Sequence, residues 1–165
     1  MKIRYLSCFY FLVSLSLAQS GTGNEERIKE LDDYWAQVSK SVREGDFESY
    51  KKTCHQEGVL VSGSNGSSYP LSDALIRWEK DFTATKKGRI KASVQFRFSK
   101  RISDRSTAHE TGIFLYSSTV PGEDPKNSYV HFEALLVKRK GRWKIMMEYQ
   151  KSKASQAEWD GLATK

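Results

Sequence analysis

The 165-residue sequence predicts an α+β fold, in which three helices precede a four-strand antiparallel meander. Apolar residues recur at helical spacing as far as Phe82, and from Ile90 onward they alternate with polar residues, which is the period of a strand. Short polar turns separate the four alternating segments. Because the apolar faces of helices and sheet must cover each other, we expect a curved sheet wrapped around the long first helix.

The first helix is expected over residues 24–44. Its apolar side chains follow at spacings of three, four, three and four, forming one stripe: Ile28, Leu31, Trp35, Val38 and Val42. Gly45 ends this helix, and Asp46 can cap a second, short helix from Phe47 to about His55, with Tyr50 on its inner side. A third helix follows Pro70 and carries Leu75, Ile76, Trp78 and Phe82.

The remaining chain predicts strands. A short strand covers residues 59–61, and the polar, glycine-rich residues 62–68 after it are expected to be a flexible loop. Long strands are expected at residues 90–99, 107–118, 129–138 and 142–150. These elements define one domain over residues 24–151, followed by a tail, 152–165, with one helical turn near residues 157–162.

Residues 1–18 have the pattern of a cleaved signal peptide. Lys2 and Arg4 precede an apolar run that closes on Ser16, Leu17 and Ala18, small residues at the positions that a signal peptidase reads. The run of about 13 apolar residues is short for the alternative, a membrane anchor, which needs about 20. We therefore expect a secreted or periplasmic protein that begins near Gln19.

Composition excludes several classes of protein. With 38% hydrophobic residues and only three prolines, the chain is neither disordered nor collagen-like.

Its formal charge of +7 falls to +5 when Lys2 and Arg4 are removed, and Cys54 is then the only cysteine. A single thiol cannot form an internal disulfide, so we expect Cys54 to be buried and unreactive.

Four short motifs resemble the nuclear transport factor 2-like superfamily: Gly45-Asp46 after an amphipathic helix, residues 54–59, residues 108–112 and residues 141–145. The resemblance is greatest to its secreted SnoaL-like and ketosteroid-isomerase-like members of unassigned function. It implies a cone-shaped sheet with a pocket between its concave face and the helices. Homodimers formed through the sheet are common in that superfamily, so a homodimer is also expected.

The resemblance does not extend to the isomerase chemistry. The positions at which those isomerases carry a hydrogen-bonding tyrosine and a catalytic base are occupied by Val38 and Ser62. Valine has no proton to donate to a developing oxyanion, and an unassisted serine is no base near neutral pH.

Candidate site residues lie on the expected helix and strands. Glu110 and Glu148 are the candidate catalytic carboxylates, because an inward-facing carboxylate is desolvated and its pKa rises toward the range useful for proton transfer. The candidate ligand-binding residues are Trp35, Glu110, His131 and Glu148. Exposure on the outer face is the alternative, and strand alternation does not settle which face looks inward.

The sequence contains few signals of other kinds of functional site. The three histidines lie in separate segments, so no metal site is expected, and no phosphate-binding loop or Gly-x-Ser-x-Gly motif is present. No cofactor is therefore predicted. Basic residues gather where solvated loop ends and a hairpin tip are expected, so nucleic acid is not predicted as a partner either. Two functions remain: an exported module that binds a small apolar or amphipathic molecule, or a small lyase, isomerase or hydrolase that uses a pocket carboxylate.

Overall fold

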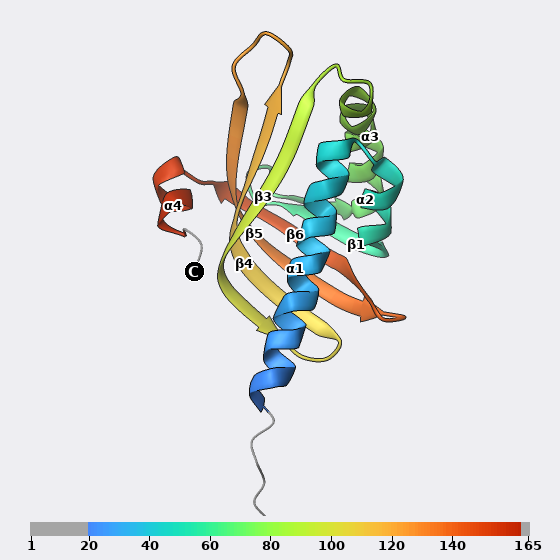
Figure 1. Ribbon diagram of the computed structural model, residues 1–165, viewed down its shortest axis with the longest axis vertical. Coiled ribbons are helices and arrows are strands. Elements are labelled where there is room, and N and C mark those ends of the chain that lie inside the picture. Colours follow the sequence, from blue (N-terminus) through green and yellow to red (C-terminus); the bar gives the residue numbers. More distant parts are fainter. Residues whose placement is uncertain (1–19, 163–165) are drawn as a thin grey trace, which may run out of the picture.

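A computed structural model of the chain describes residues 20–162. The three expected helices are α1 (Ser20–Glu44), α2 (Phe47–Thr53) and α3 (Leu71–Lys86), and the tail forms a fourth, α4 (Gln156–Gly161). Figure 1 shows α1 lying across one face of the sheet, with α2 and α3 beside its C-terminal end. The proposed signal peptide, residues 1–18, lies outside the described residues.

The sheet has six strands in the order β2-β1-β6-β5-β4-β3. Their bounds are β1 (Cys54–Ser62), β2 (Ser67–Pro70), β3 (Lys91–Ser103), β4 (Thr107–Thr119), β5 (Lys126–Arg139) and β6 (Arg142–Lys153). Strands β3 to β6 form the expected antiparallel meander. The α+β fold class is confirmed, but the sheet is mixed, because β1 runs parallel to β6.

The expected loop over residues 62–68 was too long, because residue 62 belongs to β1 and residues 67 and 68 belong to a further strand. Residues 67–70 form β2, an edge strand that pairs antiparallel with residues 59–62 of β1. The pairing uses backbone groups, so it does not need the apolar side chains on which the loop prediction relied.

A tight corner joins α1 to α2. Asp46 accepts a hydrogen bond from the backbone N–H of Ser49 at 3.0 Å and so caps α2. Gly45 has a φ of +65°, and a Cβ atom there would lie 2.4 Å from the backbone nitrogen of Lys86. Only glycine therefore lets α3 pack this closely against the corner.

The apolar stripe of α1 packs against the concave face of the sheet. Leu31 and Phe132 are fully buried there. The Trp35 ring lies 4.3 Å from that of Phe96 and 5.8 Å from that of Phe132, measured between centroids. Aromatic packing of this kind, and not any feature of the helix alone, fixes α1 on the sheet.

Irregularities in the strands bend the sheet around α1. In β3, Phe98 pairs with Gly112 and Lys100 with Thr111, so Ser99 has no partner on β4 and forms a bulge. A Cβ atom on Gly112 would lie 2.0 Å from the carbonyl oxygen of Arg97, so only glycine fits opposite this bend.

The short helix α4 packs on the convex face of the sheet, opposite α1 (Figure 1). Ser155 and Glu158 form a capping box at its start. Its Trp159 is 4% exposed, with the Arg97 guanidinium 4.2 Å above the ring and Tyr129 beside it. None of the helices among residues 20–162 is long and apolar enough to cross a membrane.

Candidate functional site

A cavity of about 300 Å³ lies between the helices α1, α2 and α3 and the concave face of the sheet. Its wall is mainly aromatic and aliphatic. Nine aromatic side chains line it: Tyr34, Trp35, Tyr50, Trp78, Phe82, Phe96, Phe114, Tyr116 and Phe132. This volume and lining are typical of sites for small, largely apolar molecules.

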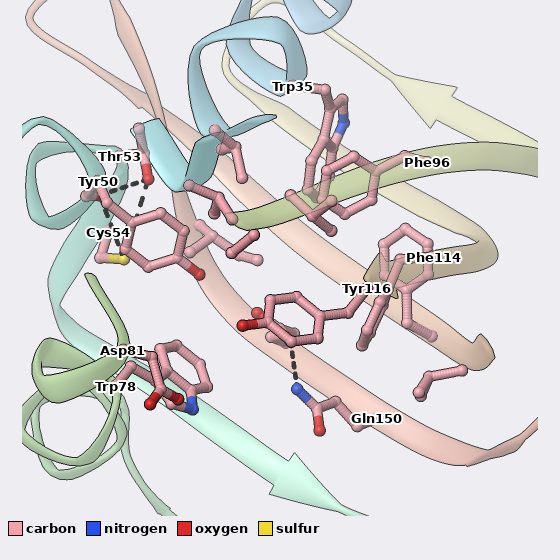
Figure 2. A pocket seen from close by; sticks show the side chains of 18 of the residues that line it. Trp35, Tyr50, Thr53, Cys54, Trp78, Asp81, Phe96, Phe114, Tyr116 and Gln150 are labelled. Atoms are coloured by element: carbon pink, nitrogen blue, oxygen red, sulfur yellow. Dashed lines mark hydrogen bonds between the residues drawn. The ribbon is translucent and has the colours of Figure 1, made fainter. Parts of the chain in front are cut away.

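Polar side chains lie in the middle of this cavity and at its opening. Figure 2 shows the hydroxyl groups of Tyr50 and Tyr116 pointing into the cavity from opposite sides. Asp81 of α3 is an exposed residue on the lining, beside Trp78. The remaining polar lining residues are Thr53, Thr85, Ser128, Glu148 and Gln150.

A bulge in β6 turns Glu148 toward the cavity. Ile145 pairs with Leu136 and Met147 with Leu135, so Met146 has no partner on β5 and the alternation of side chains reverses there. Ile145 and Glu148 therefore both line the cavity, although regular alternation would put them on opposite faces.

The Glu148 carboxylate has one hydrogen-bond partner among residues 20–162. The Gln150 side-chain nitrogen donates to its Oε1 at 2.7 Å. Burial raises the pKa of Glu148, and the hydrogen bond from Gln150 offsets only part of this effect. Glu148 is thus a half-buried, partly desolvated acid that faces the cavity.

The groups beside Glu148 are also desolvated. The Tyr34 hydroxyl donates to the carbonyl oxygen of Thr53 at 3.3 Å, and burial raises the pKa of Tyr34 and of Tyr50 well above the ordinary value. Burial raises the pKa of the Cys54 thiol to about 12. Cys54 is buried, as the sequence predicted, and its raised pKa keeps the thiol protonated near neutral pH.

Glu110 lies behind the cavity wall and not on it. It is 0% exposed, accepts a hydrogen bond from Trp35 Nε1 at 2.5 Å, and is paired with the Arg101 side chain through Nε. Arg101 also donates to Asp32 of α1 at 2.6 Å. Figure 2 shows the indole nitrogen of Trp35 directed away from the cavity, so Glu110 holds the ring whose other side lines the pocket.

The structure does not bring all four candidate residues together. Trp35 and Glu148 line the cavity and Glu110 supports Trp35. His131 is on the convex face, where its Nε2 lies 3.1 Å from Glu158 of α4, so it is not part of this site. Val38, at the position of the isomerases' tyrosine, contributes only an apolar side chain to the cavity.

Sequence reasoning missed Tyr116, Trp78, Asp81 and Gln150. Tyr116 could have been found, because it shares strand parity with Ala108 and Glu110, both buried on the concave side. Asp81 and Trp78 lie on the inner side of α3 near Phe82. Gln150 faces inward only because of the bulge at Met146, which leaves no signal in the sequence.

The site offers little to a metal ion. Within residues 20–162, no three side chains of the types His, Cys, Asp and Glu come together in a geometry that could hold one. The cavity's polar groups are instead of the kind that hydrogen-bond or pair with an organic ligand.

No family model and no curated protein matches this sequence. Solved structures do match its fold. A protein of unknown function from Shewanella oneidensis, described as NTF-2 like, superposes with a TM-score of 0.58 and 16% identity, over 74% of this chain and 97% of that one.

Two further structures show the same likeness. A ketosteroid isomerase-like protein from Erwinia carotovora atroseptica gives a TM-score of 0.56 and 14% identity over 79% of this chain and 98% of its own. ActVI-ORFA from Streptomyces coelicolor gives 0.61 and 12% over 75% of this chain and 95% of its own.

A curved sheet closed by helices around an aromatic cavity places the chain in a class of cone-shaped α+β proteins. Within that class it has the nuclear transport factor 2-like fold, and the resemblance stated from the sequence is confirmed at the level of the fold. The neighbours with this fold include an isomerase-like protein and a protein of unknown function, so the site and not the fold must carry the functional argument.

Proposed function

We propose that this protein binds a small apolar or amphipathic molecule in the cavity. One observation carries the proposal: nine aromatic rings surround a space of about 300 Å³ in which a desolvated carboxylate, Glu148, has only Gln150 as a partner among the described residues. Aromatic walls supply contact area, and a few polar groups fix the orientation of a ligand.

Native mass spectrometry of the purified protein tests the proposal by detecting a retained ligand. Ala92 lines the cavity, so Ala92→Phe should fill it and abolish retention. Val120→Phe is the matched control, because Val120 is exposed and does not line the cavity. Equal retention by both variants would place the ligand elsewhere and refute the proposal.

A second candidate is a small acid–base enzyme that uses Glu148. The observation that favours it is the raised pKa of Glu148, which brings this carboxyl closer to the range for proton transfer, together with the nearby Tyr50 hydroxyl. If the protein is an enzyme, a ligand recovered from Glu148→Gln should be converted to a product of different structure when wild-type protein is added. Recovery of the same molecule from both proteins favours binding alone.

We also propose that the protein is exported, on the pattern of residues 1–18. The intact mass of protein recovered from its native host should correspond to a chain that begins near Gln19. A mass that includes Met1, recovered from a membrane fraction, would favour an anchor instead.

A further inference from the structure

We propose that the cavity selects an organic cation, namely a hydrophobic amine whose ammonium group pairs with Glu148. The inference rests on the binding function proposed above and names the chemical class of the ligand. Three features of the cavity lead to it: the charges on its wall, the incomplete pairing of Glu148, and the aromatic side chains that line the same cavity.

The wall is acidic in a basic protein. Among residues 20–162, those lining the cavity include two carboxylates, Glu148 and Asp81, and no lysine, arginine or histidine. The whole chain carries a formal charge of +7, yet none of the described lysine, arginine or histidine side chains lines this space. A ligand with a negative charge would meet two like charges here and no counter-charge.

The titratable side chains on every element packed around the cavity fit an acidic wall. The titratable groups that line the cavity with Glu148 are acidic or neutral: Tyr34 of α1, Tyr50 of α2, Cys54 of β1, Asp81 of α3 and Tyr116 of β4. Lys144 of β6 is a cation that lies close to Cys54, at this end of the cavity. Its ammonium group donates to the carbonyl oxygens of Lys52 and Cys54, at 2.8 and 3.3 Å, and does not line the cavity.

Among the residues that the structure describes, Glu148 therefore has no cationic partner. Gln150 satisfies one lone pair on Oε1, but an amide carries no charge and cannot offset the cost of burying an ionised carboxylate. A buried carboxylate is stable when a cation pairs with it in good geometry. An ammonium group bound beside Glu148 would supply that cation, and the bond to Gln150 already orients the carboxylate.

The aromatic wall suits both parts of such a ligand. The hydroxyl groups of Tyr50 and Tyr116 point into the cavity from opposite sides, and their oxygens can accept hydrogen bonds from an ammonium group (Figure 2). Phe96, Phe114 and Phe132 provide the apolar surface for the rest of the molecule. Asp81, exposed on the lining, adds a negative charge that draws cations toward the cavity.

Binding of a cation must be linked to the protonation of Glu148. Burial raises the pKa of this carboxyl above its ordinary 4.5, so part of the free protein carries a proton there in mildly acidic solution. An ammonium ligand expels that proton, and its affinity should rise with pH until Glu148 is ionised in the free protein. A neutral acceptor would bind the protonated acid and show the opposite dependence.

Three probes of matched size separate these possibilities: phenethylamine, phenethyl alcohol and hydrocinnamate. In calorimetric titrations of the purified protein near neutral pH, we expect the amine to bind about tenfold more tightly than the alcohol, and the carboxylate to bind most weakly. Glu148→Gln should remove the preference for the amine and leave the affinity for the alcohol within about twofold. Glu133→Gln, on the convex face, is the matched control and should change neither.

Asp81→Asn serves as a second variant, because Asp81 is exposed and its replacement does not disturb the core. It should weaken the amine by about twofold to threefold without affecting the alcohol. Equal binding of amine and alcohol, or tighter binding of the carboxylate, would overturn the inference while leaving the proposed binding function intact. Failure of all three probes would overturn both.

Discussion

Two glutamates on neighbouring strands have opposite environments. Burial raises the pKa of Glu148, whereas the hydrogen bond from Lys151, followed by lesser contributions that include His109, lowers the pKa of Glu133 on the convex face. The ordinary value for both is 4.5. The same substitution at these two positions should therefore change stability in opposite directions.

For Glu148→Gln, the free energy of unfolding should equal that of the wild type near pH 4 and exceed it increasingly as pH rises. The wild type loses stability as pH climbs from 4.5 through the raised pKa of Glu148, and the variant has no charge to bury there. A tenfold change in an ionisation constant on folding corresponds to about 1.4 kcal/mol of stability. Urea unfolding between about pH 4 and pH 8 measures the difference.

Glu133→Gln should have the opposite effect on the free energy of unfolding. Its depressed pKa stabilises the fold above pH 4.5, and that contribution is lost as pH falls through the folded-state pKa. The variant should therefore be less stable than the wild type at neutral pH and equal to it in strong acid. A change of the same sign at both positions would contradict the assigned environments.

Glu110 should behave as a structural residue. It is fully buried, and both Trp35 and Arg101 donate to it. Replacing one partner of a buried ion pair costs about 3–5 kcal/mol, so Glu110→Ala should lower the free energy of unfolding by roughly that amount at neutral pH. A loss below about 1 kcal/mol, measured by urea unfolding, would show that Arg101 finds enough compensation from Asp32.

At the scale of the elements, the bulges explain what the sequence could not reveal. Alternation along β6 put Trp143 and Ile145 on one face and Glu148 on the other, but the unpaired Met146 places all three on the concave side. The bulge at Ser99 similarly turns Arg101 toward Glu110. A bulge depends on how two strands are paired, which one strand's sequence does not specify.

Local patterns predicted well the elements that depend on them. The stripe from Ile28 to Val42 predicted α1, and the change of period near Ile90 predicted the meander. The pairing of β1 with β6 joins segments that are about 90 residues apart in sequence, so no local pattern could indicate it. The sequence therefore offered Glu148 as a candidate without a means of showing which way its side chain points, and the structure places it on the cavity lining.

The helix α4 should stabilise the fold without taking part in binding. Trp159 is buried between Arg97 and Tyr129 on the convex face, away from the cavity. Trp159→Ala should lower the free energy of unfolding by about 3 kcal/mol, as for other buried tryptophans. Urea unfolding measures this cost, and the affinity for phenethylamine should stay unchanged in the folded variant.

At the scale of the whole molecule, the homodimer stays a prediction. Half-buried apolar residues such as Leu115, Leu135 and Met147 lie on the strands of the sheet, on the side opposite the inward-facing residues. A second copy would cover them. Light scattering after gel filtration should give twice the mass of one chain, and Leu135→Lys should give a monomer; a wild-type monomer at tens of micromolar would refute the interface.

The parallel contact between β1 and β6 also governs when the protein can fold. Strand β1 cannot pair with its inner neighbour in the sheet, β6, until residues 142–153 are present. Contacts of such long sequence separation form slowly, since loop closure precedes the gain from pairing. The sheet is thus completed only after residues 142–153 have been synthesised, and a nascent chain remains open until β6 has emerged.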